Sequence, residues 1–206
     1  MTNLRLVKQL PEIIKNGEKK FNDIIKSPYV ENFKYEEIII PKGEKKNTIN
    51  QFYQGDNLLA VERLLKNGFK GKIDLIYIDP PFMTKINQEG RIVINDGEKN
   101  HVIEQVAYED NWEEGIVSYL NMLCPRLYLM KELLSEKGTL YVHLDYRTVH
   151  YVKVILDCIF GQENFLNEII WAYKSGGVSK RYYSRKHDTI LVYTKTKDYI
   201  FNPQKE

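Results

Sequence analysis

The fold is decided by one stretch in the first half of the chain, Lys72-Ile73-Asp74-Leu75-Ile76-Tyr77-Ile78-Asp79-Pro80-Pro81-Phe82. Its apolar run, Ile73 to Ile78, is rich in β-branched and aromatic residues and predicts a fully buried strand. The two prolines that follow fix φ and remove backbone donors, so the chain must leave the sheet there. The sequence therefore predicts a stiff hook at the carboxyl end of a strand, where open α/β sheets place their ligands.

The hook combines a carboxylate, carbonyl oxygens and an aromatic ring, which together suit a planar base with an exocyclic amine. Asp79 can accept one amine hydrogen, the carbonyl of Pro80 can accept the other, and Phe82 can stack on the base. The alternative is a strand that ends in a solvated aspartate and a proline turn; the position after a buried strand favours the first interpretation. The candidate catalytic residues are Asp79, Pro80, Pro81 and Phe82.

Two segments resemble the amino-methylating DNA methyltransferases, the DNA methylase N-4/N-6 family: Gly55-Asp56-Asn57-Leu58-Leu59-Ala60 and Gly71 to Phe82. The resemblance runs from about Asn50 to the end of the chain and is strongest to the adenine-N6 modification subunit of type III restriction systems. It implies S-adenosylmethionine as methyl donor, a flipped adenine as acceptor and double-stranded DNA as substrate. It also implies that Gly55, Asp56 and Asn57 lie beside the cofactor adenosine, although Asp56 or Asn57 could equally serve to cap the next helix.

Composition indicates an ordinary globular domain with its own core: 206 residues, 43% hydrophobic and 28% charged. A net charge of +2 excludes a globally basic protein that coats DNA, but it permits a local basic groove. Two cysteines far apart fit a reduced cytoplasm, and no signal peptide or membrane-spanning run is present. We expect a cytoplasmic protein with no membrane association, and we assign no metal ligands.

Alternating strand and helix patterns predict an α/β fold, a doubly wound sheet with about five strands. The resemblance implies a Rossmann-like methyltransferase sheet, of which five strands would be an incomplete set. We expect residues 1–48 to be a helical and extended appendage and 49–206 to be the target-base part of the methyltransferase domain. Strands are expected at residues 52–54, 73–78, 139–144, 166–173 and 188–194. Helices are expected as two short ones within residues 4–25, separated at Pro11 and Gly17, and at 58–65, 116–135 and 146–160.

Further expectations concern four single residues and one polar stretch. Pro125 should kink or divide the helix at 116–135, and Gly138 should end it. Asp145 should cap the helix at 146–160, with a role beside the cofactor as the less favoured alternative. His143, inside a strand, is interpreted as a core or half-buried residue without chemistry. The polar stretch 83–108, with a short strand at 91–94, should lie over the hook.

A basic segment at residues 174–187 contains no acidic residue and mixes cations with glycines and tyrosines. That pattern suits phosphates and an unstacked base, and the alternative is a solvated loop. The candidate DNA-binding residues are Lys174, Lys180, Arg181, Arg185 and Lys186.

The glycine-rich turn Phe-x-Gly-x-Gly, on which the family binds the methionine half of its cofactor, does not occur, and Gly176-Gly177 does not match it. We therefore expect the N-terminal half of an enzyme: a truncated gene product, a split protein with a separately encoded C-terminal half, or a cut piece. Such a chain should bind S-adenosylmethionine weakly or not at all and should not methylate DNA alone. A restriction subunit is a further expected partner.

Alternatives remain open at this point. The hook suits the exocyclic amine of cytosine as well as that of adenine, so a cytosine-N4 DNA enzyme or an adenine RNA enzyme is the second interpretation. A non-catalytic DNA-binding or assembly fragment is the third.

Overall fold

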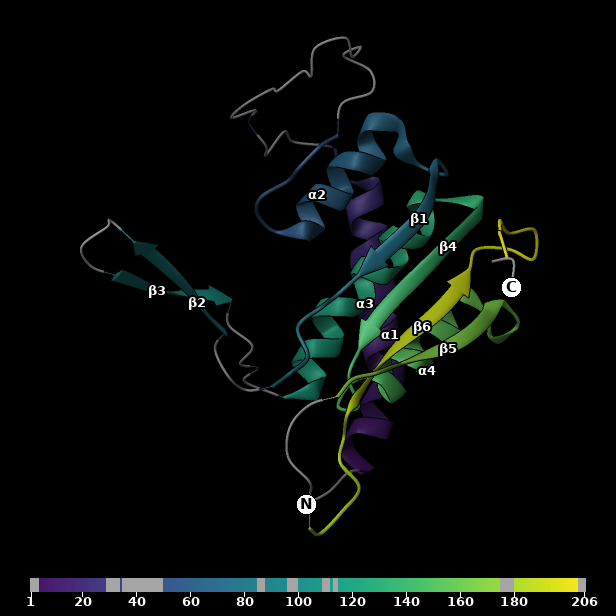
Figure 1. Ribbon diagram of the computed structural model, residues 1–206. Helices are drawn as coiled ribbons and strands as arrows, with labels where there is room; N and C mark the ends of the chain where they lie inside the picture. Colours follow the sequence, from purple (N-terminus) through teal and green to yellow (C-terminus); the bar gives the residue numbers. More distant parts are fainter. Residues whose placement is uncertain are drawn as a thin grey trace.

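A computed structural model describes residues 4–28, 34, 50–84, 88–95, 100–108, 112, 115–174 and 180–203. Four strands form its central sheet in the spatial order β1-β4-β6-β5 (Figure 1). β1 is parallel to β4, whereas β6 is antiparallel to both of its neighbours, so the predicted α/β class is confirmed with a mixed sheet. The bounds are Ile73–Ile78 for β1, Leu134–Leu144 for β4, Phe165–Ala172 for β5 and His187–Thr194 for β6.

The helices cover one face of this sheet. α3 (Ile116–Leu133) and α4 (Val149–Phe160) share a core with the inward side chains of β4 and β6. α1 (Leu4–Lys26) packs on α3 and adds Ile13 to the same core. The described part of the chain therefore shows one helical layer, and the second layer of a doubly wound sheet stays a prediction, as does a domain boundary at 48/49.

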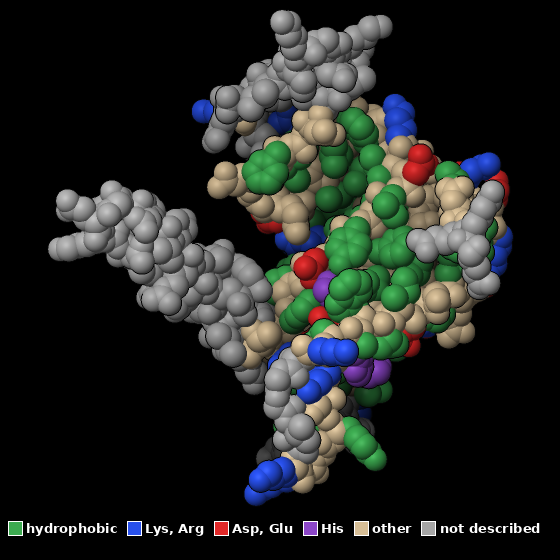
Figure 2. Space-filling model, in the orientation of Figure 1, with side chains coloured by type: hydrophobic (Ala, Val, Ile, Leu, Met, Phe, Trp, Pro, Cys, Tyr) green, Lys and Arg blue, Asp and Glu red, His purple; other side chains and the backbone are tan. Residues whose placement is uncertain are grey.

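The opposite face of the sheet carries exposed apolar side chains. Leu75 and Tyr77 on β1 are 61% and 54% exposed, and Trp171 on β5 is 61% exposed. Figure 2 shows hydrophobic side chains gathered on this face. The expectation that β1 is fully buried is therefore wrong: within the described chain it is an edge strand with one covered face, because only β4 pairs with it.

α2 (Asn57–Leu64) continues into a π-helical turn, η2 (Leu65–Phe69), and runs back beside β1 (Figure 1). Its apolar residues Leu58 and Val61 pack with Leu129 and Leu133 of α3. The predicted helix at 58–65 is confirmed. No strand forms at residues 52–54, where Phe52 is 91% exposed and lacks the burial that would hold a strand against the sheet.

α3 is one helix through Pro125, so the expected division there is wrong. Leu123, Cys124 and Leu127 around the proline are almost completely buried, and this packing outweighs the loss of one backbone hydrogen bond. The helix ends at Leu133 rather than at Gly138. Gly138 lies inside β4, where a Cβ would stand 2.8 Å from the Ile73 carbonyl oxygen, so a glycine is needed for the close approach of β1.

Two other expectations are corrected. α4 begins at Val149, three residues later than predicted, because residues 146–148 form a turn. The stretch 83–108 holds two antiparallel strands, β2 (Gln88–Asn95) and β3 (Asn100–Tyr108), of which only residues 91–94 were expected as strand. Figure 1 shows this pair projecting beside the central sheet rather than lying over the hook.

In the described residues, no helix is both apolar and long enough to cross a membrane.

α1 is also a single helix, with Pro11 inside it, instead of the two short helices expected. Gly17 is buried against α3, and a Cβ on it would clash with the Cys124 Sγ. Gly17 therefore serves the close packing of α1 on α3 and does not end a helix.

We predict that Gly17→Ala destabilises the protein, although alanine is the better helix former by about 1 kcal/mol. The added methyl group must push Cys124 out of a packed core, and overpacking of this kind costs about 1–3 kcal/mol. The free energy of unfolding, measured by urea denaturation, should fall by that amount. Asn16→Ala, at the exposed neighbouring position, is the control and should be neutral or stabilising. Equal behaviour of the two variants would contradict the close contact.

Candidate active site

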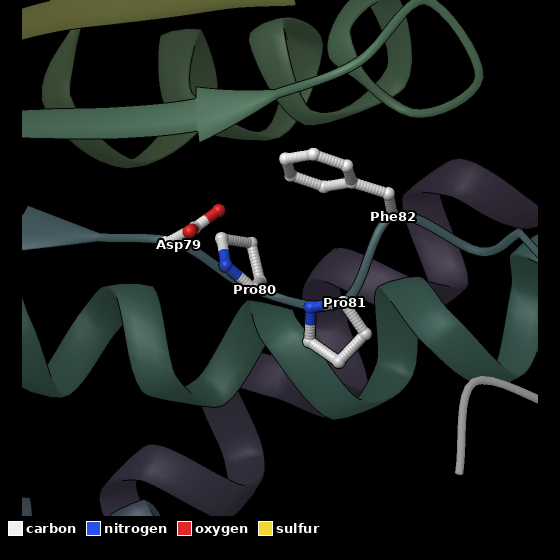
Figure 3. A pocket seen from close by; sticks show the side chains of 4 residues that line it. All are labelled: Asp79, Pro80, Pro81 and Phe82. Atoms are coloured by element: carbon white, nitrogen blue, oxygen red, sulfur yellow. The ribbon is translucent and has the colours of Figure 1, made fainter. Parts of the chain in front are cut away.

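The hook begins where β1 ends, beside the end of β4. Figure 3 shows the Asp79 carboxylate and the Phe82 ring on the same side of the hook. All four hook residues, Asp79 to Phe82, line a pocket of about 340 Å³. The Asp79 side chain is 58% exposed, so its carboxylate is accessible to a ligand. The structure thus brings together the residues that the sequence analysis selected here.

The backbone turns sharply just after Phe82. Met83 has a φ of 58°, the left-handed region that side chains other than glycine rarely adopt. Its side chain packs against the main core, which helps to hold this conformation. Local strain of this kind concentrates at functional sites, and here it fixes the direction in which the chain leaves the hook.

His143 on β4 lies against the hook, and the sequence analysis missed it. Its Nδ1 is 3.3 Å from Asp79 Oδ1 and 3.1 Å from the Tyr77 hydroxyl oxygen. The Phe82 ring meets the imidazole edge-on, with centroids 5.1 Å apart. On the other side, Nε2 is 3.4 Å from Asp188 Oδ2 of β6. The parallel register of β1 and β4 places His143 beside Asp79, and no local pattern in the sequence indicates this.

Two ionisable side chains near the strand ends, Tyr77 and Asp145, have raised pKa values. The pKa of Tyr77 is raised by desolvation and by the negative charge of Asp79. Burial raises the pKa of Asp145, and the hydrogen bonds and charge of Arg147 oppose this rise. Asp145 accepts from the backbone N–H of Arg147 at 2.8 Å, so it closes the turn before α4, while Thr148 occupies the N-cap position. The expectation that Asp145 occupies the N-cap position is therefore wrong: that position lies three residues later, at Thr148.

The turn Gly55-Asp56-Asn57, assigned to the cofactor from the resemblance, precedes α2. Because α2 runs back beside β1, this turn lies toward the end of the sheet that carries the hook (Figure 1). Asp56 Oδ1 accepts from the Leu58 N–H at 2.8 Å, which confirms its role as N-cap. Arg126 of α3 donates from Nη2 to Asp56 at 2.8 Å and from Nε to Asn57 Oδ1 at 2.6 Å. The turn is therefore fixed by α3.

The basic segment leads into β6 at the same end of the sheet. Lys174, Lys180, Arg181 and Arg185 are exposed and Lys186 is half-buried, whereas residues 175–179 lie outside the described part. The Arg185 guanidinium lies over the Tyr146 ring at 4.3 Å and over the Tyr182 ring at 5.7 Å. This stacking attaches the segment to the residue that follows Asp145, near the hook.

A family model described as DNA methylase matches residues 73–206. The chain belongs to this DNA methylase family. The type II methyltransferase M.EcaI of Enterobacter cloacae is 38% identical over 154 residues, which make up 74% of this chain. The probable type III restriction-modification enzyme HindVI Mod subunit of Haemophilus influenzae is 36% identical over 159 residues, or 75% of this chain.

The type III restriction-modification enzyme EcoP15I Mod subunit of Escherichia coli is 28% identical over 176 residues, or 79% of this chain. The two Mod subunits are parts of type III restriction-modification enzymes, the kind of protein that the resemblance indicated. The matched regions make up 31% of M.EcaI, 19% of the HindVI Mod subunit and 27% of the EcoP15I Mod subunit. The chain thus spans about a third or less of the length of these relatives.

We predict that Asp56→Ala and Asp56→Asn separate the two contacts of this side chain. Asparagine is as good an N-cap as aspartate, so Asp56→Asn should keep the cap and lose only the charge in the contact with Arg126. This pair is half-shielded, with side chains 11% and 51% exposed, so the loss should be on the order of 1 kcal/mol. Asp56→Ala also loses the cap and should cost a further 0.5–2 kcal/mol, roughly. Urea denaturation of both variants measures the difference. Equal stabilities would show that the cap contributes nothing.

Proposed function

We propose that this chain is the target-base part of a DNA methyltransferase that transfers a methyl group to the exocyclic N6 of a flipped adenine. One observation carries the proposal: a carboxylate and an aromatic ring lie on the same side of a proline hook, in a pocket of about 340 Å³ at the end of a parallel strand. This volume is in the range of small-ligand sites, and the pocket is open to an incoming base.

The hook residues act by orientation and electrostatics. Asp79 accepts one hydrogen of the base amine, and the Pro80 carbonyl accepts the other, which leaves the nitrogen lone pair directed out of the base plane. Pro81 restricts the backbone so that the two acceptors keep their geometry. Phe82 stacks on the flipped base, a contact worth roughly 1–3 kcal/mol per base. Orientation of this kind contributes directly to lowering the barrier.

S-adenosylmethionine is the proposed methyl donor, and it supplies an electrophilic methyl group on a sulfonium. The exposed turn fits a part of such a ligand: the Asp56 carboxylate is 51% exposed and can accept a hydrogen bond from it while Arg126 keeps the turn in place. Gly55 and Asn57 would line the same side. These residues can hold the adenosine half, and Phe-x-Gly-x-Gly, expected for the methionine half, is absent from the sequence.

We further propose that the sheet belongs to a Rossmann-like doubly wound fold, whose second layer covers the exposed face around Leu75 and Tyr77. The support is the exposed apolar surface on β1, which pairs with one strand only in the described chain. The remainder of a full-length methyltransferase is the proposed source of that layer and of the rest of the cofactor site. A restriction subunit is the proposed partner of the complete modification enzyme.

We predict that Asp79→Ala lowers methyl transfer about 100-fold or more, because loss of a preorganised contact to the reacting group costs this much in other enzymes. The assay is tritiated-methyl transfer to mixed-sequence duplex DNA by a preparation that combines this chain with the rest of a full-length methyltransferase. DNA affinity should change little. Nucleoside mass spectrometry of the product separates N6-methyladenine from N4-methylcytosine.

Asp74→Ala is the control for this experiment. Asp74 lies on the same strand, and its carboxylate accepts a hydrogen bond from the Ser135 hydroxyl at 2.6 Å, away from the hook. Its removal should leave transfer within about two-fold of the parent, since it contributes nothing to orientation of the base. Turnover by Asp79→Ala at the level of Asp74→Ala would overturn the assignment, and N4-methylcytosine as the product would replace adenine as the target.

We also predict that the basic segment contacts DNA phosphates. The test variant carries three substitutions at once, Lys174→Gln, Lys180→Gln and Arg181→Gln. It should bind DNA of every sequence more weakly, and the slope of log affinity against log salt concentration should fall by about 2–3. Arg185 is kept because it stacks on Tyr146. The control removes the same charge from exposed lysines of α1: Lys15→Gln, Lys19→Gln, Lys20→Gln. Equal slopes for the two triple variants would show that only net charge matters.

A further inference from the structure

The hook fixes the backbone at Asp79 but leaves its side chain without internal restraint. Prolines set φ and ψ around this residue, whereas the carboxylate is 58% exposed and can rotate about χ1. A group that accepts one amine hydrogen must hold one orientation, because small misplacements of a reacting group cost large factors in rate. The orientation of Asp79 must therefore come from a neighbour.

His143 is the neighbour in position to supply it. The β1–β4 register pairs Ile78 with Val142, so the next residues of the two strands, Asp79 and His143, lie side by side. The imidazole is only 18% exposed, and Nδ1 is 3.3 Å from Asp79 Oδ1. A proton on Nδ1 is thus available to a carboxylate oxygen of Asp79. Both ring nitrogens donate only in the doubly protonated imidazole, so a bridge between Asp79 and Asp188 requires that form of His143.

The imidazole is itself restrained on its far side. Nε2 is buried and makes no hydrogen bond to any residue of the described part, and the Asp188 carboxylate of β6 lies 3.4 Å from it. The side chain of Asp188 is 19% exposed. A small rotation of either group would bring a proton on Nε2 into hydrogen-bond geometry with Asp188.

We propose that His143 is a positioning residue: it bridges Asp188 and Asp79 and holds the Asp79 carboxylate in the orientation that receives the base amine. This inference rests on the proposed function, to which it adds a residue that acts through Asp79 rather than on the base. The competing role is packing alone, because the imidazole also lies edge-on to Phe82 and beside Tyr77.

The first test uses the 206-residue chain and needs no activity. Long-range ¹H–¹⁵N spectra report both nitrogens of each histidine, and the His143 signals are assigned by their loss in His143→Gln. The His143 Nδ1 signal should shift in Asp79→Asn, and the Nε2 signal should shift in Asp188→Asn. Asp74→Asn, at the far end of β1, is the control. Spectra unchanged by Asp79→Asn would overturn the bridge.

The second test measures methyl transfer with the same combined preparation as for Asp79. His143→Ala should lower kcat about 10- to 100-fold and leave the KM for DNA within about two-fold, since only the reacting geometry is lost. His143→Asn places an amide nitrogen near the position of Nδ1 and should recover most of the rate. His143→Gln places its amide near Nε2, toward Asp188, and should not. Thermal denaturation checks that each variant is folded.

These outcomes separate the inference from the proposed function. If the parent protein transfers methyl groups and His143→Ala does so at the same rate, only the positioning role is overturned. If His143→Asn and His143→Ala have equally reduced rates, His143 acts through packing. A parent preparation that transfers no methyl group overturns the proposed function and the role of His143 in it together, whatever the spectra show of the contact itself.

Discussion

The parallel register between β1 and β4 is the constraint on which the site depends. Ile76 pairs with Leu140 and Ile78 with Val142, so β4 continues for two residues past the end of β1, alongside the start of the hook. Leu140 and Val142 are completely buried on α3 and α4, and a slip by one residue would turn them toward solvent. The core thereby fixes which residue of β4 lies beside Asp79, and that residue is His143.

α3 connects the two halves of the site. Its buried residues around Leu127 support the central strands, while Arg126, on another side of the same helix, donates hydrogen bonds to Asp56 and Asn57. One rigid element thus positions the hook indirectly and the turn before α2 directly. In the proposed function, the base amine and the methyl donor must be oriented closely relative to each other, and one shared helix would keep the hook and this turn in a fixed relation.

The sequence predicted the strands β1, β4, β5 and β6 and the helices α2 and α3, because each depends on local periodicity. It misjudged Pro11, Gly17, Pro125 and Gly138, each of which was interpreted as a break or an end. Gly17 and Gly138 instead allow close approach of another element, which no local pattern reveals. Pro125 is tolerated because the residues around it are buried.

By itself, the sequence determined that the chain makes a proline hook after a strand and that this hook holds a carboxylate and an aromatic ring. Those features follow from the fixed φ of proline and from residue identity. Only the tertiary structure decided what surrounds the hook: His143 from β4 and Asp188 from β6, which are 64 and 109 positions away from Asp79 in the sequence. Strand order and register set these neighbours, and both arise from packing of the whole core rather than from any local segment.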